Sequence, residues 1–132
     1  MSDRNRLLSA ALIAFGLTFC LVYPLAMVWP SGWAWHEGSP AASNYFMMIV
    51  GLYATLGLFL LRAAKDPPAH ASLIWFTVWS SVVHAAIMAW QSLAQPGERG
   101  HLLGDVPALL LVALVLGSLM NRAGGGSAAP AA

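Results

Sequence analysis

Residues 71–95 read ASLIWFTVWSSVVHAAIMAWQSLAQ and contain no Asp, Glu, Lys or Arg, although a histidine, His84, lies near the middle of the run. A helix needs about 20 apolar residues to cross the hydrocarbon core of a bilayer. This run is long enough to do so. It therefore predicts a membrane-spanning helix, in which an ionisable side chain marks the first place to look for function.

The rest of the chain has the same character. Of its 132 residues, 59% are hydrophobic and 8% are charged, whereas a soluble domain has about 25% charged residues. Three further runs contain no charged residue: Leu7–Trp29, Ser43–Leu61 and Val106–Asn121. We predict an all-α fold, a transmembrane up-down four-helix bundle in residues 1–122, with a flexible tail at 123–132 and spans at about 7–29, 43–63, 71–93 and 104–121.

The first run could instead be a signal peptide, because Arg4 and Arg6 precede it. It is longer than the apolar region of about 7–15 residues that such peptides contain, and Val22–Pro30 contains no small-x-small cleavage site. We therefore expect it to be retained as the first span. The single cysteine, Cys20, lies within it, so no intramolecular disulfide is possible.

The basic residues indicate how the predicted bundle is oriented. Arg99 is expected on one side of the membrane, and the other five of the six basic residues are expected on the opposite side: Arg4, Arg6, Arg62, Lys65 and Arg122. Because Lys and Arg accumulate on the cytoplasmic side, both termini are predicted to be cytoplasmic. Trp29, Tyr45 and Trp90 would then lie near the outer interface, which aromatic residues favour.

Polar side chains recur along one face of the third span. Seven residues make nearly two full turns of a helix, so residues seven apart share a face. The resulting stripe consists of His70, Thr77, Ser81, His84, Met88 and Gln91. Such a stripe is expected to face the interior of the bundle or a water-filled cavity.

The first two spans carry comparable faces. On the first span these residues are Ser9, Gly16, Cys20, Tyr23 and Met27, and on the second they are Asn44, Met48, Gly51, Thr55 and Arg62. We predict an outward-opening polar pocket that binds a small hydrophobic or lipid-like molecule, with His84 at its floor. Its candidate ligand-binding residues are His84, Tyr23, Met88, Ser81, Gln91, Met48 and Cys20.

Several other interpretations of His84 remain open. The side chain could join helices through a hydrogen bond to a backbone carbonyl or to Tyr23. With Cys20, Met48 and Met88 it could form a soft-metal site, because these ligand types suit copper(I), although no spacing fixes such a geometry. A haem would need a second histidine facing His84; no other span supplies one, so only a dimer could pair two His84 side chains. No metal or cofactor is assigned from the sequence.

The sequence argues against one class of function, nucleic-acid binding, and leaves others open. A net charge of +1 and the lack of a basic stripe argue against nucleic acid. Whether the protein is an enzyme stays open, because no Ser/His/Asp set, paired carboxylates or HExxH motif names a reaction. The expected partners are membrane lipid, a small hydrophobic ligand and, as alternatives, a second copy of the chain or a membrane complex in which the protein is an accessory subunit.

Two connections have residues with a structural interpretation. In the turn AAKDPPAH, Asp66 could neutralise Arg62, Lys65 and His70 and cap the third span. Asp105 is expected to cap the fourth span. His36, Glu37 and His101 are expected to be solvated loop residues.

Residues 53–92, YATLGLFLLRAAKDPPAHASLIWFTVWSSVVHAAIMAWQS, resemble a group of small bacterial four-span membrane proteins with no assigned activity. The motif residues are Arg62, Asp66, Pro67, His70, Ser72, Trp79, Ser80, Ser81 and His84. The overall plan also looks like that of the DoxX-like four-helix membrane proteins. This resemblance implies a compact helical bundle in a bacterial inner membrane and an accessory role in redox or stress systems, and it carries over no catalytic residue.

Overall fold

The computed structural model describes residues 3–29 and 39–124, and within these residues the chain is all-α, as predicted. The α-helices are α1 (Asp3–Cys20), α2 (Val22–Val28), α3 (Asn44–Ala63), α4 (Ala71–Ala94) and α5 (Asp105–Gly124). Three 3-10 helices lie in the connections: η2 (Pro40–Ala42), η3 (Pro68–His70) and η4 (Pro96–Leu102). The predicted loop residues His36 and Glu37 and the tail beyond Gly124 lie outside the described residues.

The first apolar run is bent rather than straight. The axes of α1 and α2 differ by 56° at Leu21. Pro24 explains the position of the bend, because proline has no N–H to donate to the carbonyl of Cys20, four residues earlier, and its ring collides with that carbonyl. The hydrogen bonds on either side continue, from Leu21 N to Leu17 O and from Leu25 N to Leu21 O.

Within the part of the chain that the structure describes, three helical segments are long and apolar enough to cross a membrane, namely Asn44–Ala63, Pro68–Ala94 and Arg99–Arg122. A fourth is present if the bent α1–α2 pair counts as one span. These lengths and compositions indicate a membrane protein. The surface agrees, since large apolar side chains such as Trp79, Trp90 and Leu114 are mostly exposed, and an aqueous solvent would penalise so much apolar surface.

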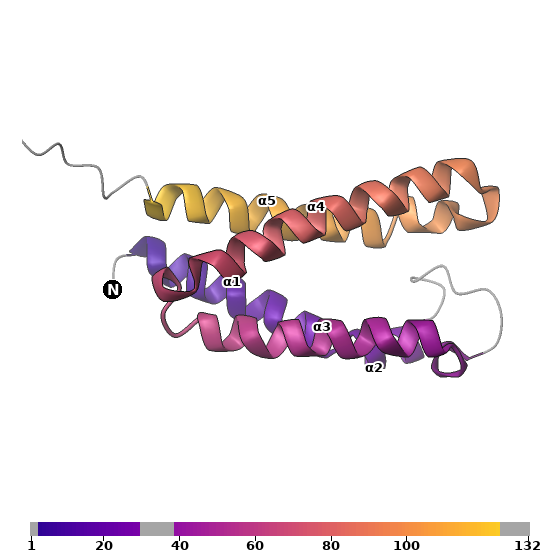
Figure 1. Ribbon diagram of the computed structural model, residues 1–132, viewed down its shortest axis with the longest axis horizontal. Coiled ribbons are helices and arrows are strands. Elements are labelled where there is room, and N and C mark those ends of the chain that lie inside the picture. The colour runs from indigo at the N-terminus through magenta and orange to yellow at the C-terminus, as the bar shows by residue number, and fades with distance from the viewer. Residues whose placement is uncertain (1–2, 30–38, 125–132) are drawn as a thin grey trace, which may run out of the picture.

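The helices form two antiparallel pairs (Figure 1). One pair is α1 with α3, the other is α4 with α5, and contacts between the pairs run mainly from α1 to α5. Helices α3 and α4, although consecutive, touch little. The N-terminal end of α1, the α3–α4 turn and the C-terminal end of α5 lie at the same end of the molecule, which we call the N-terminal end; η4 lies at the opposite end.

The two pairs share a hydrophobic core only towards the N-terminal end. That core contains Leu8 and Leu12 of α1, Leu60 of α3, Ile74 of α4 and Leu116 of α5. Towards the η4 end, a smaller cluster lies mainly within the α4–α5 pair, formed by Ala85, Val106 and Leu109 with Met88, Ala89 and Leu102 beside it; from α3, Tyr53 packs against it. The pairs are therefore packed together at one end and diverge at the other.

Two glycines explain why α1 and α3 approach so closely. A Cβ atom added at Gly57 would lie 2.6 Å from Gly16 O and 2.7 Å from Cys20 Sγ. Small residues at such a crossing let helix backbones approach each other. Cys20 Sγ completes the contact by donating to Ala54 O at 3.7 Å.

The predicted caps differ from the structure. Neither η3 nor α4 receives a side-chain cap, so the prediction that Asp66 caps the third span is wrong; instead, Pro67 is fully buried and its carbonyl accepts a hydrogen bond from His70 N. Arg62, Lys65 and Asp66 are exposed, and His70 is half-buried. Asp105 is the first residue of α5 rather than a residue preceding it, and its carboxylate contacts His101.

Candidate functional site

A tyrosine–histidine hydrogen bond joins the two helix pairs where they begin to diverge. The Tyr53 hydroxyl on α3 lies 2.8 Å from Nδ1 of His84 on α4. The Tyr53 ring also packs edge-on against Phe19 of α1, with centroids 5.0 Å apart and planes 72° apart. One side chain thereby connects α1, α3 and α4.

A pocket of about 240 Å³ lies further towards the η4 end. Its lining residues are Met88, Gln91, Ser92, Gln95 and His101. Four of these come from the last two turns of α4 and the residue after it, and His101 comes from η4. Because η4 folds back over the end of α4, the α4–α5 hairpin forms this pocket from its own residues.

Ser92 is the unusual residue of this pocket. It has 0% of its surface exposed, and its Oγ has no hydrogen-bond partner within the described residues. A buried hydroxyl without a partner costs about 1–3 kcal/mol, and native structures contain few of them. Ser92 lines the pocket, but its side chain is closed to solvent, so the unpaired hydroxyl lies just behind the pocket wall.

His101 is held by a carboxylate. Its Nδ1 pairs with Oδ2 of Asp105, four residues further along the chain. Asp105 begins α5, where the helix dipole favours a negative charge. Asp105 also interacts electrostatically with Tyr53 and His84.

The predicted stripe on α4 does face inward over most of its length. Thr77 and Ser81 are buried, and His84 and Met88 are half-buried. Thr77 satisfies its hydroxyl through Leu73 O at 2.9 Å. Gln91 is exposed at the end of the stripe and lines the pocket together with Met88. The structure therefore brings Met88 and Gln91 together in the pocket, with His84 one turn before Met88 on α4.

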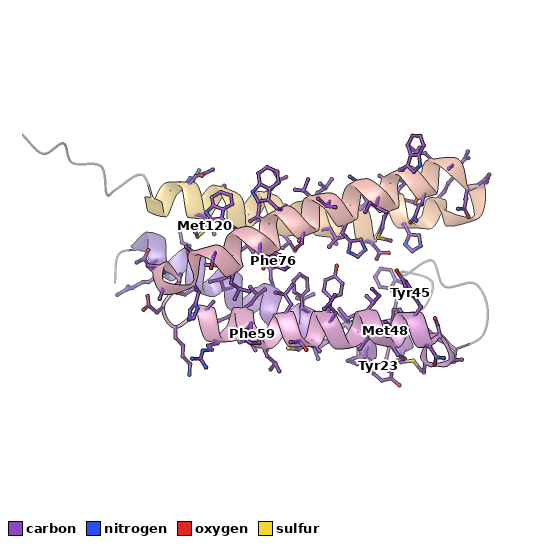
Figure 2. All side chains as sticks on the ribbon, in the orientation of Figure 1. Tyr23, Tyr45, Met48, Phe59, Phe76 and Met120 are labelled. Carbon is purple, nitrogen blue, oxygen red and sulfur yellow. The ribbon has the colours of Figure 1, made fainter. Side chains whose placement is uncertain are left out.

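The other candidate residues lie elsewhere. Tyr23 is 37% exposed and points away from α4 (Figure 2), so the bond between His84 and Tyr23 considered above does not form. Met48 is 71% exposed. Cys20 contacts α3 at the glycine crossing. The bend after Cys20 is the reason that Tyr23 and Met27 do not continue the inward face of α1.

The prediction for the second span is wrong. Its supposed inward face is exposed at every position: Asn44, Met48, Gly51, Thr55 and Arg62. Instead, α3 turns Tyr53, Gly57, Leu60 and Ala64 inward. Sequence reasoning missed Tyr53. Residues three or four apart share one face of a helix, and Tyr53 lies four residues before Gly57, so it shares the face on which α3 packs closely against α1.

Three residues of the pocket were also missed. Ser92 and Gln95 follow the α4 stripe at the i+1 and i+4 positions from Gln91, and His101 was assigned to solvent. In the residues that the structure describes, no group of three or more His, Cys, Asp and Glu side chains lies together. Of the residues in the soft-metal interpretation, Met48 is mostly exposed and Cys20 lies at the α1–α3 glycine crossing, whereas His84 and Met88 lie on α4.

These features define an all-α protein with three or four helices suited to crossing a membrane and a small polar pocket at one end of a helical hairpin. The chain belongs to a family described as "Family of unknown function (DUF6632)", whose model matches residues 2–132. No curated protein and no solved structure matches the chain.

Proposed function

We propose that this is an integral membrane protein that binds a small amphipathic molecule, with the polar part of the ligand in the pocket formed by Met88, Gln91, Ser92, Gln95 and His101. The observation that carries the proposal is the buried, unpartnered Ser92 hydroxyl in the pocket wall. A polar group that reached Ser92 Oγ, which the pocket wall covers, would supply the hydrogen bond that the protein leaves unmade.

The surroundings of the pocket support a ligand that is polar at one end and apolar at the other. Gln91 and Gln95 are exposed at the end of a long apolar helix, and the neighbouring Trp90 is 75% exposed. Tryptophan at such a position favours the interface between water and lipid. A molecule could therefore place its polar group in the pocket while its apolar part stays in the lipid.

The orientation that fits this proposal places the pocket outside the cytoplasm of a bacterial inner membrane. Arg6, Arg62, Lys65 and Arg122 belong to the N-terminal end of the molecule, and Arg99 belongs to the η4 end. The bias of basic residues towards the cytoplasm supports cytoplasmic termini. The DoxX-like plan inferred from the sequence is compatible with this arrangement.

The test is whether a ligand occupies the pocket in a membrane environment. The full chain is extracted directly from the membrane into polymer nanodiscs, and bound lipids are identified by native mass spectrometry. Gln95→Trp should fill the pocket and reduce the bound species, because Gln95 is exposed and tolerates a larger side chain. Asn44→Trp on α3 is the matched exposed control and should leave the bound species unchanged.

A protein that retains no specific molecule, or one whose bound molecules survive Gln95→Trp, would contradict ligand binding at this pocket. Recovery of a stoichiometric protein partner together with an empty pocket would favour the alternative of an accessory subunit.

A further inference from the structure

The charges around the pocket restrict the ligand that it takes. None of the five lining residues is Asp, Glu, Lys or Arg. They supply two carboxamides, one hydroxyl, one thioether and one imidazole. The carboxylate of Asp105 is hydrogen-bonded to His101, one of the lining residues.

An anionic head group finds no fixed positive charge in this lining. Phosphate and carboxylate sites in proteins use Arg, Lys or a set of backbone N–H groups. Arg99, the basic residue of η4, is exposed and does not line the pocket.

The pocket lining also lacks the groups that usually bind a cationic head group. Quaternary ammonium groups are bound over the faces of Trp, Tyr or Phe rings, and the lining residues include no Trp, Tyr, Phe or carboxylate. Asp105 is committed to His101, so using it for a cation would cost that bond.

The hydrogen-bonding groups point to a ligand that both donates and accepts. The Ser92 hydroxyl has one hydrogen to donate and two lone pairs, and each glutamine amide has both donors and an acceptor. An alcohol hydroxyl matches all of them. A ketone or an ester only accepts, so it would leave the amide oxygens without a donor from the ligand.

The size of the pocket sets a second restriction. Sites for drug-sized molecules have volumes of about 300–1,000 Å³, and this pocket has about 240 Å³. It therefore holds a head group rather than a whole lipid.

We propose that the pocket recognises the uncharged, hydroxyl-bearing head of a lipid, for which a monoacylglycerol is the model compound. This inference rests on the proposed function, because it names the chemical class that the same pocket binds. Ser92 is the residue on which the recognition depends most, since its hydroxyl has no other partner within the described residues.

The experiment compares four photoreactive lipids that share one acyl chain, with the reactive group beside the head. The heads are glycerol, a free carboxylate, trimethylammonium and a methyl ester. The full chain is placed in phosphatidylcholine nanodiscs, because maltoside detergents are themselves uncharged and hydroxylated and would compete. Saturable labelling of the peptides that carry residues 88–101 is measured by mass spectrometry.

The expected result is that the glycerol lipid half-saturates the pocket at a concentration about tenfold below the other three, and that Ser92→Ala removes about this tenfold preference. Ser80→Ala is the control, because the Ser80 hydroxyl lies on the same helix and already bonds to Thr77 O at 3.2 Å. It should leave the preference intact.

The outcomes separate the two proposals. If the carboxylate or ammonium lipid labels the pocket as well as the glycerol lipid does, the inference that the head group is uncharged fails. The proposal that the pocket binds a ligand still stands in that case. Equal labelling by the methyl ester would overturn the requirement for a hydroxyl. The absence of saturable labelling by every probe would overturn both the head-group assignment and the proposed function.

Discussion

The Tyr53 hydroxyl and Nδ1 of His84 lie 2.8 Å apart, and their bond joins α3 to α4, two helices that otherwise touch little. Towards the N-terminal end, the helix pairs are held by a shared apolar core. Beyond this bond, the pocket belongs to the α4–α5 hairpin alone. Tyr53 and His84 therefore mark the boundary between the packed part of the protein and the part that presents the pocket.

A double-mutant cycle should detect the coupling between these residues. Tyr53→Phe and His84→Leu should each lower the free energy of unfolding by about 1 kcal/mol, because each leaves a polar partner without its hydrogen bond. The double variant should lose less than the sum, with a coupling of about 0.6 kcal/mol, the average that double-mutant cycles give for hydrogen bonds between membrane helices. Unfolding in mixed micelles of increasing denaturing detergent measures these values.

The control for this cycle is Tyr45→Phe, since Tyr45 lies on the same helix but is 75% exposed. Its coupling to His84→Leu should be zero. Purely additive losses for Tyr53 and His84 would argue that their bond does not stabilise the contact between the pairs.

The close crossing of α1 and α3 predicts that alanine substitutions at two glycines of α3 have very different effects on stability. Gly57→Ala should destabilise the protein by about 1–3 kcal/mol, because the added methyl group would meet Gly16 O and Cys20 Sγ, and overpacking forces the backbones apart. Gly51→Ala, with nothing within 4 Å of the added atom, should be neutral or stabilising by up to about 1 kcal/mol through helix propensity. Thermal unfolding of both variants decides the matter, and equal stabilities would contradict the close approach of α1 and α3.

Ser92→Ala should stabilise the ligand-free protein. Removing a buried hydroxyl that lacks a partner relieves its desolvation cost, so the free energy of unfolding should rise by about 1 kcal/mol. Ser80→Ala should instead lower it by about 0.5–1.5 kcal/mol, because that hydroxyl is bonded to Thr77 O. Both are measured in phosphatidylcholine nanodiscs. A loss of stability in Ser92→Ala without added ligand would indicate that the Ser92 hydroxyl has a partner within the protein.

Pro24→Ala should straighten the first apolar run. The alanine restores a donor for Cys20 O and removes the clash that produces the 56° bend. In a Cys20→Ala background, spin labels at Ala10 and Met27 should move apart, towards the backbone separation of about 25 Å that a straight helix gives over 17 residues at 1.5 Å each. Labels at Leu7 and Leu17, both within α1, should keep their separation. An unchanged distance between Ala10 and Met27 would assign the bend to packing rather than to Pro24.

Much of the architecture was accessible from the order of the residues. The charge-free runs predicted the apolar helices, and three of the predicted spans agree with α3, α4 and α5 to within a few residues. The inward stripe of α4 was also predicted, because Thr77, Ser81 and His84 are polar on a helix that is otherwise apolar. Length and polarity are local properties, so each can be obtained by counting along one segment.

How those helices pack against one another could not be predicted by counting along single segments. A helix that is apolar on every side presents no hydrophobic period, so the exposed face of α3 with Met48 and Thr55 was mistaken for its inward face, and Tyr53 was missed. Steric contacts set the true faces, since Gly16 and Gly57 allow one close crossing and Pro24 turns Tyr23 away from the interior. The pocket needs η4 folded over the end of α4, which places Ser92 beside His101. Local chemistry thus predicts which segments become apolar helices, whereas packing between distant segments determines which side chains meet.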